Sequence, residues 1–292
     1  MTDPESLIAF QGAPGAYSNL ACISAFPEMT PLPCSSFEGA FGAVEDGKAR
    51  YAMIPIENSI AGRVADIHHL LPGTGLHIIG EHFEPVRHFL MAPKGATLET
   101  IKKVRSHVHA LGQCRKAIRE LGLQAIVHVD TAGAAADLQD SDDVTESAIA
   151  SSLAAETYGL QVLRGEMEDH SYNTTRFIVL AREPAMPDLS DEVAITTFIF
   201  RVRNVPAALY KALGGFATNG VNMTKLESYM VEGEFFATQF YADIEGHPDD
   251  ARVKLALEEL GFFSREFRLL GVYPGSPFRR RGFQRKQEGA DD

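Results

Sequence analysis

The stretch HSYNTTRFIVL, residues 170–180, places small polar side chains directly before an apolar run. Residues 177–181 have the composition of a short buried strand. The polar residues from Asn173 to Arg176 have two interpretations. They form either a surface loop that ends where the core begins, or a cluster of hydrogen-bond donors at a strand edge that faces a ligand.

A carboxylate follows another apolar stretch, in the sequence PIENS at residues 55–59. Glu57 could act as a general acid or base, or it could cap the first turn of a helix and stabilise it by up to about 1 kcal/mol. Gly62 comes shortly after, and a glycine inside a helix costs about 1 kcal/mol relative to alanine. We therefore expect either a close approach of another group at Gly62 or a helix that starts later.

A glycine-rich turn, GAPGAYS, occupies residues 12–18. It lacks the third glycine of a dinucleotide fingerprint and the Lys-Ser/Thr pair of a phosphate-binding loop. Pro14 and Gly15 fit the two central positions of a type II turn. The segment is therefore a tight strand-to-helix turn, or a turn in which Ser18 also caps the helix and offers its hydroxyl to a ligand.

No residue stands out as a nucleophile or a metal ligand. Gln113 and Cys114 lie one turn into a predicted helix, and Cys114 falls on its apolar face, which indicates a core residue. The sequence contains no evident Ser-His-acid arrangement. The three cysteines and the scattered ten histidines lack metal-ligand spacing. We expect reduced thiols at Cys22, Cys34 and Cys114 and no metal site.

The composition, with 45% hydrophobic and 23% charged residues among 292, is that of an ordinary soluble globular protein. The net charge is −12, from 27 basic and 39 acidic side chains, which argues against nonspecific nucleic-acid binding. No apolar run is long enough to span a membrane, and the acidic start MTDPESLIAF does not resemble a signal peptide. We therefore expect a cytoplasmic protein with neither nucleic acid nor membrane as a partner.

The elements that must position the polar motifs alternate between strands and helices. Five apolar segments are each followed by a polar turn and an amphipathic helix: LIAF, YAMIPI, KKVR, AIVHV and SAIA. This alternation predicts parallel sheets with helices on both faces, and such sheets bind ligands at the carboxyl ends of their strands. The polar motifs all lie at such ends. In the last helix we expect Ser151 or Ser152 as cap and Gly159 as terminator.

A change of pattern marks a second domain. Residues 181–191 contain two prolines and alternating charges, which is typical of a linker. The following segment predicts the order strand, helix, strand, strand, helix, strand, which is the ferredoxin-like arrangement. Its helices are expected at 205–219 and in a segment that ends at Gly261. The tail, residues 275–292, has few apolar residues and is expected to be disordered.

Taken together, GAPGAYS, PIENS with Gly62, SHVHALGQC, DTAGAA and NTTRF resemble the prephenate dehydratase family. The later segment VPAALYKALGGFATNGVNMTKLES resembles the ACT regulatory domain that these enzymes carry. The resemblance implies an α/β, two-lobed, periplasmic-binding-protein-like catalytic domain at residues 5–182, with the active site between its lobes. It also implies a ferredoxin-like (βαββαβ) ACT domain at residues 192–274.

The resemblance also assigns roles to residues. It implies an essential threonine at Thr175 and further catalytic residues at Glu57, Asn58 and Gln113. The residues expected to bind substrate are Ser18, Ser59, Ser106, Thr131, Ala132, Asn173, Arg176 and Phe177. Those expected to bind an effector are Ala207, Ala208, Leu209, Asn222, Glu227 and Ser228.

Three motifs depart from the family pattern. Many members read Ser-His-Pro-Gln where this chain has SHVH at residues 106–109, which affects the expected shape of that loop. The ACT motif usually reads Glu-Ser-Arg-Pro, whereas Tyr229 and Met230 follow Glu227 and Ser228 here. The usual Gly-Ala-Leu of that domain is Ala207-Ala208-Leu209 here. These two departures concern the effector site and leave a ferredoxin-like dimerisation module without ligand as an alternative.

Prephenate loses its ring hydroxyl and CO2 to give phenylpyruvate, and the barrier lies in the departure of the poor leaving group. A donor aimed at the leaving oxygen lowers that barrier. The resemblance therefore makes Thr175 an orienting donor, which relays a proton from Glu57 or from water. Arg176 alternates with Thr175 along the strand and points to the other face, so a structural salt bridge is at least as well founded as a substrate contact.

The same resemblance implies L-phenylalanine biosynthesis, feedback inhibition by L-phenylalanine, no cofactor, and a homodimer or homotetramer formed through ACT domains. An arogenate dehydratase and a non-catalytic amino-acid sensor remain alternatives, since the fold alone does not define the function.

Overall fold

The computed structural model describes residues 3–189, 193–230 and 237–279. The chain divides into two compact units, of which the first consists of Met1–Val64 and Phe83–Phe177 and the second of Ala65–His82 and Ile178–Asp292. The expected domain boundaries differ from this division, because residues 65–82 group with the C-terminal part of the chain. The end of the expected linker, residues 190–191, lies outside the described residues.

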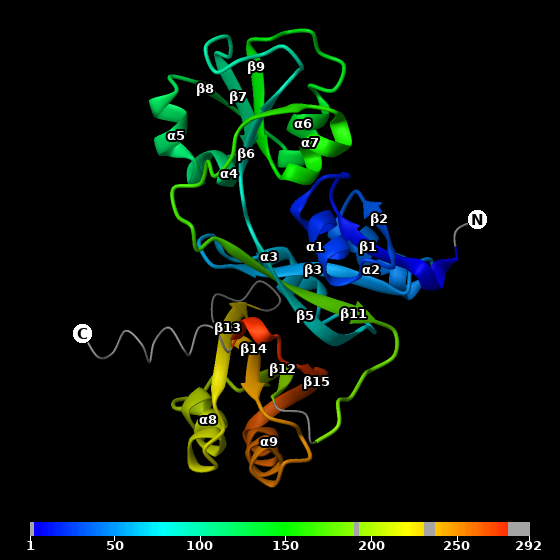
Figure 1. Ribbon diagram of the computed structural model, residues 1–292. Helices are drawn as coiled ribbons and strands as arrows, with labels where there is room; N and C mark the ends of the chain where they lie inside the picture. Colours follow the sequence, from blue (N-terminus) through cyan, green and yellow to red (C-terminus); the bar gives the residue numbers. More distant parts are fainter. Residues whose placement is uncertain (1–2, 190–192, 231–236, 280–292) are drawn as a thin grey trace. The chain divides into compact units, whose positions relative to one another are not determined.

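The first sheet is six-stranded, with the strand order β2-β1-β3-β11-β5 and β4 paired with β3 (Figure 1). Strand β1 pairs in parallel with β2 and β3, whereas β4 is antiparallel to β3. Helices α1 and α2 pack against these strands. The elements, after a short 3-10 turn at Pro4–Ser6, are β1 (Leu7–Gln11), α1 (Tyr17–Ala25), β2 (Thr30–Cys34), α2 (Phe37–Glu45), β3 (Tyr51–Asn58), β4 (Gly62–Arg63), α3 (Ala65–Leu70), β5 (His77–Pro85) and β11 (Thr174–Ala181).

The turn before α1 has the predicted type II form. The Ala16 N–H donates to the Ala13 carbonyl at 3.0 Å, and Gly15, at the third position, has a φ of +86°. The expectation that Ser18 caps the helix is wrong. The N-cap is Ala16, without a side-chain hydrogen bond, and Ser18 is already the second residue of the helix.

The second sheet has the order β10-β6-β9-β7-β8. Strand β7 is parallel to β8 and β9, as expected, but β6 is antiparallel to both β9 and β10. The prediction of purely parallel sheets is therefore wrong, although the alternation of strands and helices is confirmed. The elements are β6 (Phe89–Ala92), β7 (Lys103–His107), α4 (Val108–Gln113), α5 (Arg115–Glu120), β8 (Gln124–His128), α6 (Thr131–Ala136), β9 (Glu146–Ala150), α7 (Ser152–Tyr158) and β10 (Gln161–Arg164).

Local signals explain where the helices of this sheet begin and end. The Ser151 hydroxyl accepts the Ala154 N–H at 3.1 Å, and Gly159 ends α7 with a φ of +64°, both as predicted. The single helix expected around Cys114 is in fact two helices, because Cys114 leaves the helical region with a φ of −117°. Its side chain is fully buried in the hydrophobic core, as predicted.

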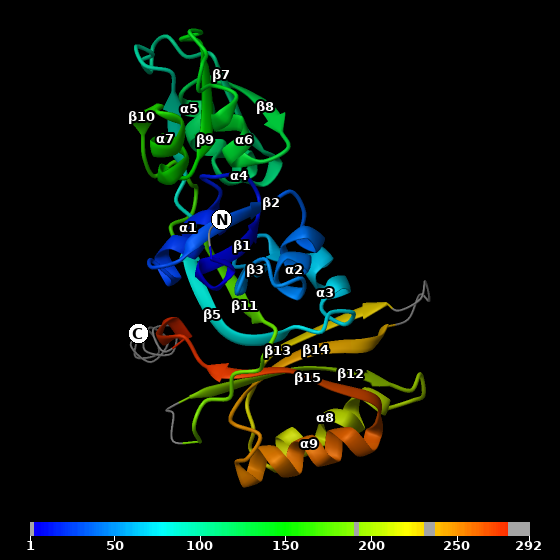
Figure 2. The ribbon, with the colours of Figure 1, turned by 90° about the vertical axis from the view of Figure 1, so that its right-hand side faces the viewer.

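The C-terminal part of the chain has the predicted order of a ferredoxin-like fold. Its four strands form an antiparallel sheet in the order β13-β14-β12-β15, and α8 and α9 lie side by side on one face of it (Figure 2). Helix α9 continues beyond Gly261, where it was expected to end. The elements are β12 (Ala194–Val202), α8 (Ala208–Thr218), β13 (Met223–Met230), β14 (Ala237–Glu245), α9 (Ala251–Phe263) and β15 (Ser264–Pro274).

The first residues of the expected tail are held in place by a buried carboxylate. The guanidinium of Arg279 pairs with Glu81 at 2.6 and 2.8 Å, and the Ser276 N–H donates to the same carboxylate at 2.9 Å. The expectation of disorder is therefore wrong for residues 275–279, whereas residues 280–292 lie outside the described part of the chain. No helix within the described residues is long and apolar enough to cross a membrane.

Candidate functional site

Asn58, the last residue of β3, is the centre of a network of side-chain amides. Its Oδ1 accepts the backbone N–H groups of Ile60 and Ala61 at 2.9 and 2.8 Å. Since only an oxygen can accept two N–H groups, the orientation of the Asn58 amide is fixed by the backbone. Its Nδ2 therefore donates to Asn173 Oδ1 at 2.8 Å and to Thr175 Oγ1 at 3.0 Å.

The Thr175 hydroxyl is consequently an acceptor towards Asn58. A hydroxyl has one hydrogen, and Thr175 cannot direct it to an amide nitrogen that is itself a donor. Among the described residues, no protein acceptor is found for this hydrogen. Thr175 is half-buried at the start of β11. Its hydroxyl can therefore donate to an oxygen atom of a bound ligand.

Asn173 extends the network to the second sheet. Its side chain is 1% exposed, and its Nδ2 donates to Gln113 Oε1 at 2.8 Å. Gln113 is the last residue of α4, and its backbone carbonyl accepts the Asp169 N–H at 2.6 Å. The predicted residues Thr175, Asn58, Asn173 and Gln113 are thus brought together, although 55 or more positions separate most of them along the chain.

Glu57 and Arg176 form a separate pair. Arg176 Nη1 lies 2.9 Å from Glu57 Oε1, and the Arg176 side chain is 3% exposed. Because side chains alternate along a strand, Glu57 and Arg176 point to the face of the sheet opposite to Asn58 and Thr175. The structure therefore contradicts the helix-capping interpretation of Glu57 and does not bring it to Thr175 as a proton relay. The salt-bridge interpretation of Arg176 is confirmed.

Ser59 fixes the polar segment before β11. Its hydroxyl donates to the Tyr172 carbonyl at 2.9 Å and accepts the Thr174 N–H at 3.0 Å. Its own N–H donates to the Thr174 carbonyl at 2.9 Å. Ser59 thus holds the backbone on both sides of Asn173. The late helix start expected at Gly62 is also found, because Gly62 lies in β4 with a φ of +82° and α3 begins at Ala65.

Several expected substrate contacts lie elsewhere. Ser106 is fully buried in β7 and donates to the Ile149 carbonyl at 2.6 Å, so the structure does not bring it to the amide network. The side chains of Phe177 and Ala132 are core residues with at most 1% exposure. Thr131 begins α6, where Asp130 is the cap, and no hydrogen bond described for this part of the chain joins it to the amide network. Ser18 is likewise buried, in α1.

Two residues that the sequence interpretation missed complete the network. His88 Nε2 lies 2.8 Å from Gln113 Oε1, and His88 Nδ1 lies 2.7 Å from the Tyr17 hydroxyl. The same hydroxyl also donates to the Arg87 carbonyl at 2.8 Å. Tyr17 belongs to the GAPGAYS motif, which was the sequence signal closest to it. No pattern marks His88, whose side-chain partners are 25 and 71 residues away.

Charges around His88 come from Glu168 and Arg87. The Glu168 carboxylate accepts the His88 N–H at 2.9 Å and pairs with Arg87 at 2.9 Å. Burial opposes the charge on Glu168, but these hydrogen bonds outweigh it and hold its pKa below the usual value. Burial lowers the pKa of His88, against the smaller raising effects of the Gln113 hydrogen bond and of Glu168. Burial also raises the pKa of Tyr17, and the Cys114 thiol and Glu168 add to this effect.

Burial disfavours the thiolate form of the cysteines. Burial raises the pKa of Cys22 to about 12, and burial together with Glu168 and Asp169 raises the pKa of Cys114 further still. All three cysteines are unpaired thiols. Among the described residues, no group of His, Cys, Asp and Glu side chains could hold a metal ion.

The GAPGAYS turn also joins the two sheets of the first unit. Ser151 Oγ donates to the Gly15 carbonyl at 2.6 Å, and the Tyr158 hydroxyl donates to the Pro14 carbonyl at 2.8 Å. A Cβ on Gly15 would lie 2.7 Å from the Ala154 Cα, so this turn approaches α7 too closely for a side chain. The motif thus places Tyr17 opposite His88.

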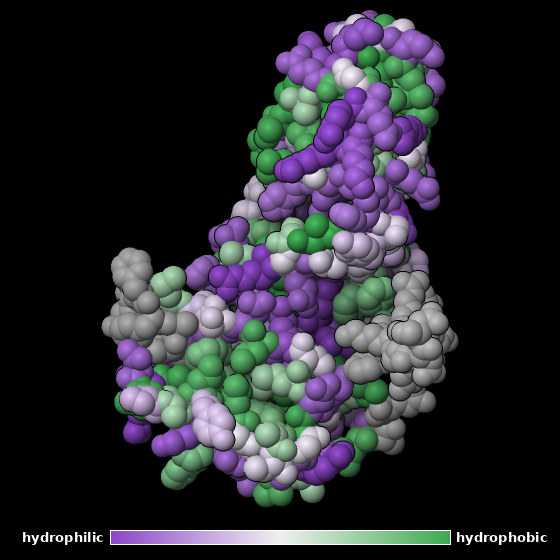
Figure 3. All heavy atoms as spheres, turned by 90° about the vertical axis from the view of Figure 1, so that its left-hand side faces the viewer, coloured by the Kyte–Doolittle hydropathy of each residue, from purple (hydrophilic) through white to green (hydrophobic). Residues whose placement is uncertain are grey.

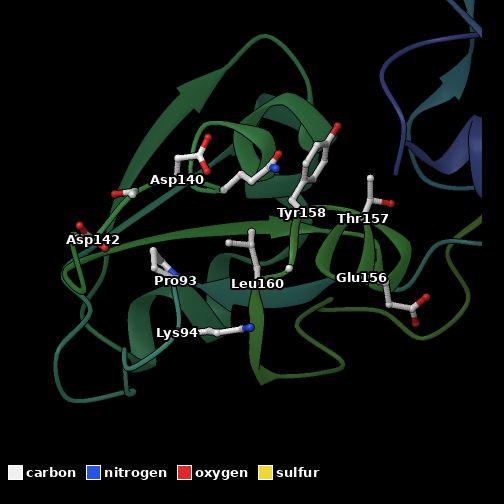
Figure 4. A pocket seen from close by; sticks show the side chains of 11 residues that line it. Pro93, Lys94, Asp140, Asp142, Glu156, Thr157, Tyr158 and Leu160 are labelled. Carbon is white, nitrogen blue, oxygen red and sulfur yellow. The ribbon is translucent and has the colours of Figure 1, made fainter.

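A polar hollow of 670 Å³ lies beside α7 and shares no residue with the amide network (Figure 4). The carboxylates of Asp140, Asp142 and Glu156 line it together with Lys94. It contains none of the predicted site residues.

The residues expected to bind an effector lie in the C-terminal fold. Ala207, Ala208 and Leu209 line a hollow of 240 Å³ at the start of α8, where Ala207 has a φ of +62°. Asn222 Nδ2 donates to Glu245 at 2.8 Å, and Glu227 pairs with Lys225 at 3.2 Å. Asn222, Glu227 and Ser228 do not line this hollow.

The fold is α/β, and its candidate site joins amide and hydroxyl side chains from separate elements by hydrogen bonds. The family model for prephenate dehydratase matches residues 8–185. This chain therefore belongs to the prephenate dehydratase family.

Relatives are similar over nearly the whole chain. A bifunctional N-acyl-homoserine lactone acylase/prephenate dehydratase of Komagataeibacter europaeus is 53% identical, over 95% of this chain and 99% of that protein. An arogenate dehydratase/prephenate dehydratase of Arabidopsis thaliana is 40% identical, over 93% of this chain and 73% of that protein. The structure of the prephenate dehydratase from Arthrobacter aurescens in complex with L-Phe is similar with a TM-score of 0.83 and 33% identity, over 91% of this chain and 89% of that one.

Proposed function

We propose that this protein is a prephenate dehydratase, which converts prephenate to phenylpyruvate, water and CO2. The observation that carries the proposal is the hydrogen bond from Asn58 to Thr175, because it leaves the Thr175 hydroxyl hydrogen available for an oxygen of the substrate. A leaving hydroxyl is such an oxygen. Membership of the prephenate dehydratase family supports the same reaction.

In the proposed reaction, the bond between the ring and its carboxylate breaks, and its electron pair enters the ring. The bond between the ring and its hydroxyl oxygen breaks at the same time, and the hydroxide takes up one proton to become water. Thr175 donates a hydrogen bond to the departing oxygen and stabilises the charge that develops there. The pKa of an aliphatic hydroxyl is too high for full proton donation. Since Glu57 is paired with Arg176, we assign the proton to water.

The direct test is an ultraviolet assay of phenylpyruvate formation from purified protein and prephenate. Thr175→Ala should lower kcat by roughly two to three orders of magnitude with a modest change in KM, as expected for one lost donor. Thr175→Ser should retain much more activity, because the hydroxyl stays. No turnover by the wild-type protein would refute the function and favour an amino-acid sensor, and unchanged kcat in Thr175→Ala would refute the role of Thr175.

Two further substrates belong in the same assay series. Arogenate carries an amino group in place of the keto oxygen of prephenate, and the relative from Arabidopsis thaliana bears both activities in its name. The relative from Komagataeibacter europaeus, which matches over nearly its full length, is named as an N-acyl-homoserine lactone acylase as well. Comparison of kcat/KM for prephenate, arogenate and an N-acyl-homoserine lactone decides the preference.

We further propose that the ferredoxin-like fold is an ACT domain at residues 192–274 that binds L-phenylalanine and inhibits the enzyme. The hollow at Ala207, Ala208 and Leu209 adjoins the first N–H groups of α8, which suit a carboxylate. The Arthrobacter aurescens enzyme was solved with L-Phe, which supports this effector. Calorimetric titration of the full chain with L-phenylalanine, together with inhibition kinetics, tests the proposal; no heat and no inhibition at millimolar concentration would reject it.

The catalytic domain, residues 5–182, is proposed to be two-lobed and periplasmic-binding-protein-like, and the protein to be cytoplasmic. We also propose that two or four copies associate through the C-terminal fold. Hydrophobic side chains gather on the surface of this unit (Figure 3), and Val205, Leu226 and Met230 are 56%, 39% and 55% exposed. Leu226 and Met230 lie on β13, an edge strand that a second copy can cover. Light scattering on the full chain gives the copy number.

A further inference from the structure

The proton position on His88 follows from a chain of hydrogen bonds that starts at the backbone. The N–H groups of Ile60 and Ala61 fix the Asn58 oxygen, so the Asn58 nitrogen must face the Asn173 oxygen. The Asn173 nitrogen then faces the Gln113 oxygen. That oxygen can only accept from His88, so His88 Nε2 carries a hydrogen.

The other ring nitrogen of His88 faces Tyr17. His88 is 2% exposed, and the lowered pKa favours the neutral ring, in which Nδ1 is then an acceptor. The raised pKa of Tyr17 keeps its hydroxyl protonated, so it can donate to Nδ1 across 2.7 Å. The Arg87 carbonyl, at 2.8 Å, competes for the same hydrogen. The Tyr17 hydrogen supports the tautomer that the amide side chains require when it is directed to Nδ1, whereas donation to the Arg87 carbonyl alone would leave the Tyr17 oxygen as an acceptor towards His88.

We propose that His88 and Tyr17 are positioning residues for Thr175. An amide side chain can turn over at little steric cost, and the opposite tautomer of His88 would favour a reversed Gln113 and Asn173, against the Asn58 orientation that the backbone fixes. When Nε2 is protonated, His88 at one end of the amide series and the backbone N–H groups at the other end favour the same orientation of Gln113, Asn173 and Asn58. The Thr175 hydroxyl hydrogen is then directed away from Asn58 and towards the substrate.

The kinetic test rests on the proposed dehydratase function. His88→Phe keeps a ring but removes the donor, and should lower kcat by about 10- to 100-fold with KM within about threefold, since misplaced catalytic groups have effects of this size. His88→Gln places an amide donor near the former Nε2 and should restore kcat to within about fivefold of wild type, roughly one hydrogen bond. If His88→Gln were no more active than His88→Phe, or if His88→Phe kept the wild-type kcat, the positioning role would be wrong.

A matched pair of tyrosine variants separates positioning from mere packing. Tyr17→Phe should lower kcat by about 2- to 10-fold, the loss expected for one hydrogen bond. Tyr158→Phe removes a hydroxyl that also donates across the two sheets to a backbone carbonyl, at 2.8 Å, but does not touch the network. It should keep the wild-type kcat. Equal losses in the two variants would contradict the proposal.

The tautomer can be read without turnover by nitrogen-15 nuclear magnetic resonance of the full chain, with the His88 signals assigned by His88→Gln. We expect a protonated Nε2 and an unprotonated Nδ1, and single side-chain amide signals for Asn58, Asn173 and Gln113 that become multiple in His88→Phe. A protonated Nδ1 together with an unprotonated Nε2 would overturn the proposal. Because this readout needs no substrate, it decides the tautomer even if the wild-type protein fails to convert prephenate.

Discussion

Replacement of Asn58 by aspartate changes a single group of the site and hardly alters its volume. One carboxylate oxygen keeps the two backbone N–H donors of Ile60 and Ala61, which hold the side chain in place. The other oxygen replaces the nitrogen that lies 3.0 Å from Thr175 Oγ1. The Thr175 hydroxyl then becomes the donor in that contact, and its hydrogen is no longer available to the leaving oxygen.

The size of the effect follows from this change of direction. The Thr175 hydroxyl is still present, but it no longer donates a hydrogen bond to the substrate. Asn58→Asp should therefore lower kcat by about 10²- to 10³-fold, as removal of an oxyanion-stabilising donor does. The double variant Asn58→Asp/Thr175→Ala should then be no slower than Thr175→Ala alone, because both changes remove the same interaction. Steady-state kinetics of the three variants with prephenate measure this. A kcat for Asn58→Asp within about threefold of wild type, or strictly additive losses, would refute the reasoning.

The pH dependence of the same variant has a defined sign. A carboxylate that accepts two backbone N–H groups has a pKa at or below the usual value of about 4. Protonation gives it back an O–H donor where the asparagine nitrogen was. The activity of Asn58→Asp relative to wild type should therefore rise as the pH falls towards about 4 and stay low at neutral pH. The new oxygen should also cause the side-chain amides of Asn173 and Gln113 to turn over, so that each exchanges its oxygen and nitrogen positions. Gln113 would then donate to His88 Nε2, which predicts the opposite tautomer of His88 in this variant.

Three further outcomes are expected. Glu57→Gln should lower the free energy of unfolding by about 1–3 kcal/mol, and with it the melting temperature, because it removes the partly exposed carboxylate that lies 2.9 Å from the buried Arg176. It should keep kcat within about fivefold of wild type; a loss as large as that of Thr175→Ala would indicate that Glu57 donates the proton. Gly15→Ala should have a melting temperature several degrees below that of Gly95→Ala. Both glycines have positive φ values, +86° and +93°, but only a Cβ on Gly15 would clash with the Ala154 backbone. Equal melting temperatures would show that this close approach does not affect stability. Dialysis against a strong chelator should leave the activity intact, and loss that one divalent ion restores would contradict the absence of a metal requirement.

The sequence predicted those parts of the fold that local rules determine. Ser151 and Gly159 bound α7 as expected, because cap preferences act within a few residues. The strand and helix order of the C-terminal fold follows from the period of its apolar residues. The antiparallel direction of β6 was not predictable in this way, since pairing direction depends on partners far away in the chain.

The sequence named four residues that the amide network joins, Asn58, Gln113, Asn173 and Thr175, but it did not give their geometry and it missed His88 and Tyr17. Alternation along β11 indicated that Arg176 and Thr175 point to opposite faces, and the same rule applied to β3 would have separated Glu57 from Asn58. The extent of β3 to residue 58, however, depends on its pairing with β4, which the glycine at position 62 only hinted at. His88 carries no local signal, because its role arises from contacts with Tyr17 and Gln113 on other elements.

The physical demand of the proposed reaction explains why such a site is built from amides. A charged group beside the leaving oxygen would need either a partner or solvent, whereas an amide offers a donor and an acceptor at fixed positions without net charge. Each amide in the series from Asn58 to Gln113 has its orientation set by its neighbour, and the series ends on backbone N–H groups at one side and on His88 at the other. A donor whose direction is fixed in this way needs no reorganisation when charge develops on the substrate, and this preorganisation is the property that lowers the barrier.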